Sequence, residues 1–247
     1  MSGKLVDRML RQPGARFTWR MTSQDHGLIA YGQGTVDFPA EKVATLDHYV
    51  VADESAPGGS VQETEPPAAR TITTKDAVFV LAPTEDTDQE WLAIETGGGG
   101  LSTSVLAPIL WLRGSAIDHD DDRLPAGEHS ITINLRDYIN QLGSTERASE
   151  RDTLEFGRVG LSQEQILAAI HVTESGLVGR MTASIPSGVS SLVPVGHEQV
   201  EQEITLEWLP GKPVIPTPDA QMKVAADEFI HATLIESGVP GWNVESE

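Results

Sequence analysis

The sequence contains no cysteine. A chain without thiols forms no disulfide, has no thiolate nucleophile or cysteine-ligated zinc, and offers no cysteine for lipid attachment. Basic residues are also few, because 17 Lys and Arg stand against 37 Asp and Glu and give a formal charge of −20 at pH 7. Such a surface repels phosphate backbones, and no basic stripe that could displace counterions is visible. We therefore expect no nucleic-acid binding.

Long apolar runs are absent as well. The longest is SVLAPILWL, Ser104–Leu112, which is far shorter than the roughly 20 residues that a helix needs to cross a bilayer. We therefore expect no transmembrane segment. The first residues, MSGKLVDRMLRQPGARF, contain no apolar core of a signal peptide. As the sequence stands, these features predict a cytoplasmic protein, or one from which an export segment has been removed.

The segment Ser104–Leu112 is nevertheless the feature around which the chain is organised. A helix that is apolar on every side must be buried inside protein. Pro108 has no backbone N–H and fits best in a first helical turn. The sequence therefore predicts a short buried helix that begins near Ala107 and follows extended residues.

Most of the remaining sequence has the pattern of β-strands. Phe17–Met21, for example, alternates apolar and polar side chains, which is typical of a half-buried strand. Strands are predicted at 17–21, 28–38, 42–52, 71–74, 77–81, 90–96, 130–135, 166–173, 177–185 and 204–209, and helices at 4–11, 137–142 and 224–237. Gly32 and Gly34 indicate a bend or bulge in a curved sheet. Because successive strands lack intervening helices, we expect the α+β class, with one large antiparallel sheet.

No constellation of catalytic or metal-binding residues is visible. Asp118, Asp120 and Asp122 match the first ligands of a calcium-binding EF-hand loop. Arg123, however, stands where that loop needs glycine, and His129 stands where it needs glutamate. The seven histidines form no H-E-x-x-H motif, and no G-x-S-x-G motif occurs. We expect a non-catalytic protein with no metal and no cofactor, and a hydrolase whose site is assembled only by the fold is a weaker alternative.

The order of motifs along the chain has a parallel in a known family. A strand RFTWRM follows a short helix, a hairpin then reaches GQGTVDF, and EWLAIE precedes the apolar APILWLRG. A hairpin IHVTESGLVGRMTASI, a strand EITLEWL and a proline-rich GKPVIPTPDA follow. This pattern resembles the LolA-like lipoprotein-carrier superfamily, and within it the actinobacterial lipoproteins of the LppX/LprG type. The resemblance covers about Lys4–Ala220.

The resemblance implies a half β-barrel, in which a strongly curved antiparallel sheet is covered on its concave face by a few short helices. It implies a domain at 1–220, and the helical spacing of apolar residues after it predicts a C-terminal helical extension at 221–247. In that family the hollow between sheet and helices binds the acyl chains of lipids or lipoproteins, at the cell envelope. This sequence departs from the pattern in lacking a leader and a lipid-attachment cysteine, in its additional tail, and in a polar stretch at 190–202.

A pocket wall follows from combining the resemblance with the aromatic and apolar residues. We predict that it consists of Phe17, Trp19, Leu106, Leu110 and Trp111. For each tryptophan the alternative is ordinary core packing, in which the indole N–H finds a partner. The expected function is the binding of a lipid or other apolar small molecule. The alternative is an acidic protein–protein interaction module with a solidly packed core, which would attract a basic protein partner.

Overall fold

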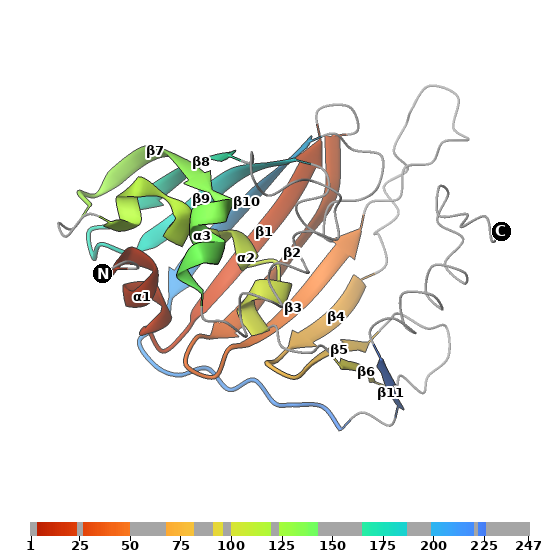
Figure 1. Cartoon of the computed structure of the whole chain (residues 1–247). Coiled ribbons are helices and arrows are strands. Elements are labelled where there is room, and N and C mark those ends of the chain that lie inside the picture. The colour runs from red at the N-terminus through yellow and green to blue at the C-terminus, as the bar shows by residue number, and fades with distance from the viewer. Residues whose placement is uncertain are drawn as a thin grey trace, which may run out of the picture.

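The computed structural model of the chain describes residues 4–23, 27–49, 68–81, 91–95, 100–119, 124–142, 165–186, 199–219 and 222–225. Within these residues, eleven strands form one sheet, and the short helices lie on its concave face (Figure 1). The strands are β1 Ala15–Ser23, β2 Gly27–Asp37, β3 Lys42–Tyr49, β4 Ala68–Thr73, β5 Ala77–Leu81, β6 Leu92–Glu95, β7 Gly127–Asn134, β8 Gln165–Val172, β9 Val178–Pro186, β10 Gln199–Trp208 and β11 Met222–Ala225. The helices are α1 Lys4–Leu10, α2 Ala107–Trp111 and α3 Leu135–Gln141, with 3₁₀ turns η1 Gly100–Thr103, η2 Leu112–Gly114 and η3 Ala116–His119.

The topology explains why a helical segment covers the concave face. The strand order is β11-β6-β5-β4-β3-β2-β1-β10-β9-β8-β7. The sheet therefore consists of two antiparallel meanders, β1 to β6 and β7 to β10, which are joined where β1 pairs with β10. The chain leaves the first meander at β6 and enters the second at β7, near the opposite edge. The connection, which carries η1, α2, η2 and η3, crosses in front of the sheet (Figure 1).

Strict alternation along the central strands separates an apolar inner face from a polar outer face. In β1, Ala15, Phe17, Trp19 and Met21 are buried, whereas the residues between them are exposed. The inner positions of β1, β2, β7, β8, β9 and β10 form one hydrophobic cluster together with α1, α3 and the crossing segment. Period-two alternation of this kind places one apolar face against a covering layer.

The predicted fold class is confirmed, with local corrections. Residues before Ala107 form the 3₁₀ turn η1, not an extended segment. Strand β10 begins at Gln199, five residues before its predicted start at Ile204, so part of the polar stretch at 190–202 is strand. Val224 and Ala225 lie in β11, parallel to β6, where a helix is predicted. The remainder of that predicted helix, 226–237, lies outside the described residues.

A bend or bulge is predicted at Gly32 and Gly34, and the bulge is wrong. Both glycines keep a regular antiparallel register with β1, opposite Trp19 and Phe17 respectively. The register shift falls instead between Met21 and Thr22. The glycines serve a different purpose, because the absent side chains leave room for the two aromatic rings of β1.

Candidate functional site

The crossing segment Gly100–Gly114, called the plug segment below, is held in shape by its own hydrogen bonds. Ser104 Oγ accepts the Leu106 N–H at 3.2 Å and donates to the Leu101 carbonyl at 2.8 Å, which closes the turn before α2. Pro108 occupies the first turn of α2, as predicted, and costs no hydrogen bond there. The segment is buried from Ser104 to Leu112 except at Leu110, as its all-round apolar pattern predicts.

A few polar contacts attach the plug segment to the rest of the fold. At its start, the Gly100 N–H donates to the Thr74 carbonyl at 3.1 Å. On the sheet side, Gln202 Nε2 of β10 donates to the Val105 carbonyl at 2.8 Å. Near its end, Gln141 Nε2 donates to the Arg113 carbonyl at 2.7 Å, and Arg113 Nη2 lies 3.1 Å from Asp7 Oδ1 of α1. Packing of apolar side chains therefore provides most of the attachment.

The structure places four of the predicted pocket residues in its large buried apolar cluster. Phe17 and Trp19 project from β1, and Leu106 and Trp111 from the plug segment, and all four belong to the same buried cluster with at most 5% of their surface exposed. Leu110 is partly buried and packs against this cluster. The five residues therefore belong to a single apolar region that the sheet and the plug segment share, and their contact with a ligand stays a prediction.

Trp19 is fixed by a polar contact that crosses a strand. Its indole Nε1 donates to Asp47 Oδ1 of β3 at 3.1 Å. The two residues stand on either side of Gly32 in one row, because Trp19 pairs with Gly32 and Gly32 pairs with Asp47. A Cβ on Gly32 would lie 2.6 Å from the indole nitrogen and 2.9 Å from Asp47 Oδ1. The missing side chain is what allows this hydrogen bond.

Asp47 is a buried carboxyl group on the inner face, and it is a functional candidate that the sequence did not single out. It is 3% exposed and also accepts hydrogen bonds from Thr45 Oγ1 at 2.6 Å and Thr71 Oγ1 at 3.2 Å. Burial raises the pKa of Asp47 above 3.8, and hydrogen bonds from Thr45, Trp19 and Thr71 oppose that rise. The Asp47 carboxyl group is therefore a polar site next to the buried apolar cluster that contains Trp19.

Replacement of Asp47 by asparagine is expected to remove a pH dependence of stability. Since the folded state holds the Asp47 proton more tightly than the unfolded chain, the free energy of unfolding falls as pH rises from 3.8 through the raised pKa. The stability of the wild type relative to Asp47→Asn should therefore fall over this window, by about 1.4 kcal/mol for each unit of pKa rise. Urea unfolding at several pH values measures the difference. The exposed Glu174→Gln is the control, and a difference for Asp47→Asn that is independent of pH would contradict the prediction.

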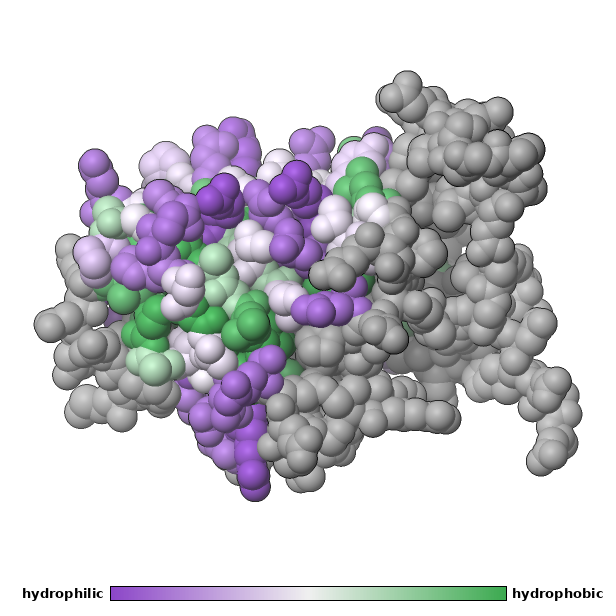
Figure 2. All heavy atoms as spheres, turned by 90° about the horizontal axis from the view of Figure 1, so that it is seen from above, coloured by the Kyte–Doolittle hydropathy of each residue, from purple (hydrophilic) through white to green (hydrophobic). Residues whose placement is uncertain are grey.

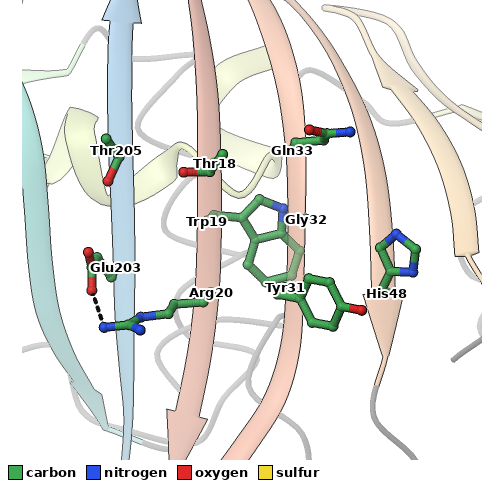
Figure 3. A pocket seen from close by; sticks show the side chains of 9 residues that line it. All are labelled: Thr18, Trp19, Arg20, Tyr31, Gly32, Gln33, His48, Glu203 and Thr205. Atoms are coloured by element: carbon green, nitrogen blue, oxygen red, sulfur yellow. Dashed lines mark hydrogen bonds and ion pairs between the residues drawn. The ribbon is translucent and has the colours of Figure 1, made fainter. Parts of the chain in front are cut away.

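The outer face of the sheet carries a polar groove of about 510 Å³ across β10, β1, β2 and β3 (Figure 3). The ring of Tyr31 points toward His48 and stacks on it, with ring centroids 4.9 Å apart and an angle of 8° between the planes. Arg20 Nη2 lies 2.6 Å from Glu203 Oε2 on the other side of the groove. The cationic and acidic groups of β1 and β10 thus neutralise each other locally, which leaves no strong charge for a ligand at that point.

Hydrophobic residues reach the surface at one end of the molecule. Figure 2 views the structure from above, and it shows hydrophobic residues gathered across the middle of this view with hydrophilic residues on either side. Partly buried apolar side chains that pack against the core, including Ile29 and Leu110, add to the cluster's outer layer. Hydrophobic residues of the described part of the chain therefore form part of the surface in this view.

The described part of the chain contains neither a cluster of metal ligands nor a helix that could span a membrane. No three His, Asp or Glu side chains gather there in a group that could hold a metal ion. Asp120 and Asp122 of the acidic loop lie outside the described residues, and only the backbone of Asp118 is described. None of the described helices is both long and apolar enough to span a membrane.

Comparisons with known proteins find similarity among solved structures. No protein-family model matches the chain, and no curated protein matches it. The crystal structure of LprF from Mycobacterium bovis is similar at a TM-score of 0.43 and 9% sequence identity, and the match covers 89% of this chain and 100% of that chain. The proposals below rest on the contacts, burial and charge of this chain.

Proposed function

We propose that this chain is a non-catalytic binding protein that holds a lipid or another apolar molecule between the concave face of the sheet and the plug segment. The observation that supports the proposal is the large buried apolar cluster to which both β1 and the plug segment belong, and which includes Phe17, Trp19, Leu106 and Trp111. The plug segment has few polar attachments. It can therefore shift away from the sheet without leaving many hydrogen bonds unmade.

Transfer of an acyl chain from water into this region supplies the binding energy. Each buried CH₂ group contributes about 0.8 kcal/mol, so a long chain binds without any charged contact. The hydrophobic residues at one end of the molecule offer an entry that a lipid tail tolerates (Figure 2). The proposed mechanism needs no cofactor and no metal.

Leu110→Trp is expected to abolish uptake of an acyl-chain probe, because a larger ring at this partly buried position fills the proposed entry beside the core. The probe is monoolein, and native mass spectrometry counts the bound molecules. Leu167→Trp is the matched control, since Leu167 is 64% exposed on the outer face of β8. The control should bind monoolein like the wild type. Unchanged uptake by a folded Leu110→Trp variant would refute the proposed pocket.

A second candidate function is the binding of a basic protein partner on the outer face. Away from the ion pair of Arg20 and Glu203, Glu201 and Glu207 face outward on β10, and the formal charge of the chain is −20. A complex of this kind would weaken strongly with added salt, because exposed charges are screened. It would also involve no extractable lipid, which separates it from the first proposal.

A further inference from the structure

Gln202 carries a buried acceptor with no partner. It lies at an inner position of β10 between Val200 and Ile204, and it is 1% exposed. Its Nε2 donates to the Val105 carbonyl of the plug segment, but its Oε1 is buried and accepts no hydrogen bond. Buried polar atoms are nearly always paired, because desolvation without a hydrogen bond is costly. An acceptor in this state indicates a missing donor.

The residues beside Gln202 in its row across the sheet have mostly small side chains. Gln202 pairs with Met21 on one side and with Ala183 on the other. Beyond these lie Ala30, opposite Met21, and Ala168, opposite Ala183. Three of the four residues around the amide are therefore alanines, so little side-chain volume separates the sheet from the plug segment there. The unpaired amide oxygen therefore lies in a row of the sheet whose side chains are mostly small.

We propose that the ligand is a neutral apolar molecule with a hydroxyl group, and that Gln202 Oε1 accepts the hydrogen bond from that hydroxyl. This inference rests on the proposed function and adds the chemical class of the ligand. The amide carries no charge, so a cationic donor would be buried there without a counter-charge, and an anionic group offers no proton to Oε1. The formal charge of −20 further disfavours an anionic lipid.

Two probes with the same acyl chain test the inference. Monoolein carries free hydroxyl groups, whereas methyl oleate carries none, and native mass spectrometry or competition with a fluorescent fatty alcohol measures the affinity of each. Wild type should prefer monoolein by roughly three- to tenfold, the effect of one added hydrogen bond. Gln202→Met keeps the side-chain length but has no amide, and it should bind both probes without this preference. Gln199→Met, an exposed position on the same strand, should keep it.

The outcomes separate the inference from the proposed function. Binding of both probes with equal affinity by the wild type overturns the role of Gln202 and leaves the proposed function standing, and this result needs no variant. A preference that survives in Gln202→Met also overturns it. Binding of neither probe by the wild type refutes the proposed function, and the inference fails with it.

Discussion

Trp111→Ala is expected to lower the free energy of unfolding by about 3–5 kcal/mol, the range for truncating a buried aromatic residue. Trp111 closes α2 and is 2% exposed within the main cluster. Removal of the indole takes away a large apolar surface and leaves a cavity. The plug segment cannot collapse into this cavity, because Pro108 and the turn at Ser104 fix its backbone. Since a domain is stable by only about 5–15 kcal/mol, the loss is a large fraction of the total.

Urea unfolding followed by circular dichroism measures the effect of Trp111→Ala. Leu110→Ala is the comparison on the same helix, and it should cost clearly less because Leu110 is only partly buried. A loss below about 1 kcal/mol for Trp111→Ala would show that the plug segment is not part of the core, against the range expected for a buried tryptophan. Such a result would also remove the basis for placing a ligand under it.

Gly32→Ala should destabilise the protein by about 1–3 kcal/mol, the range for overpacking a close contact. The added Cβ would lie 2.5 Å from the Leu46 carbonyl oxygen and 2.6 Å from Trp19 Nε1. The backbone oxygen cannot move without disturbing the β2–β3 ladder, so the indole must shift and its hydrogen bond to Asp47 must break. The effect combines overpacking with a buried carboxyl group that loses a donor.

Gly211→Ala is the matched control for Gly32→Ala, because no atom would lie within 4 Å of its added Cβ. Thermal unfolding and tryptophan fluorescence are the two readouts, since displacement of Trp19 should alter the emission as well as the midpoint. Equal midpoints for the two variants would show that the row Trp19, Gly32 and Asp47 tolerates a side chain. The inference that the Trp19 indole needs the space left by Gly32 would then be wrong.

The sequence predicts elements well where one residue pattern dominates. The apolar segment Ser104–Leu112 has no polar side to expose, and it is buried as predicted around a helix that begins at Ala107. Strand β1 alternates cleanly, so both its location and its inner face follow from the period. The antiparallel hairpins from β1 to β6 also follow from the pattern, whereas the pairing of β1 with β10 does not.

The remaining features depend on pairing that no local pattern encodes. In β3, Val43, Thr45 and Asp47 face inward while Leu46 faces outward, so hydrophobicity alone does not favour the correct face. Asp47 becomes a buried acid only because its row runs through Gly32 to Trp19. Strand β11 pairs with β6 in parallel across a long separation in sequence, which a helical spacing of apolar residues cannot reveal.

Gln202 shows how one signal in the sequence becomes clear only with the structure. It stands in the inner register of Val200, Ile204 and Leu206, where an apolar residue is expected. The polar stretch around it favours a loop, and the extension of β10 back to Gln199 is what places the amide inside. A polar residue in an otherwise apolar register is thus the local mark of the proposed contact.

Native mass spectrometry of gently purified wild-type protein, followed by solvent extraction and lipid analysis, tests whether the protein holds a lipid. We expect the protein to retain a bound molecule, which solvent extraction identifies as a neutral acyl-chain compound with a free hydroxyl group. A bare mass that persists after incubation with monoolein would contradict it, and would mean that side chains such as Trp19 and Trp111 fill the core by themselves.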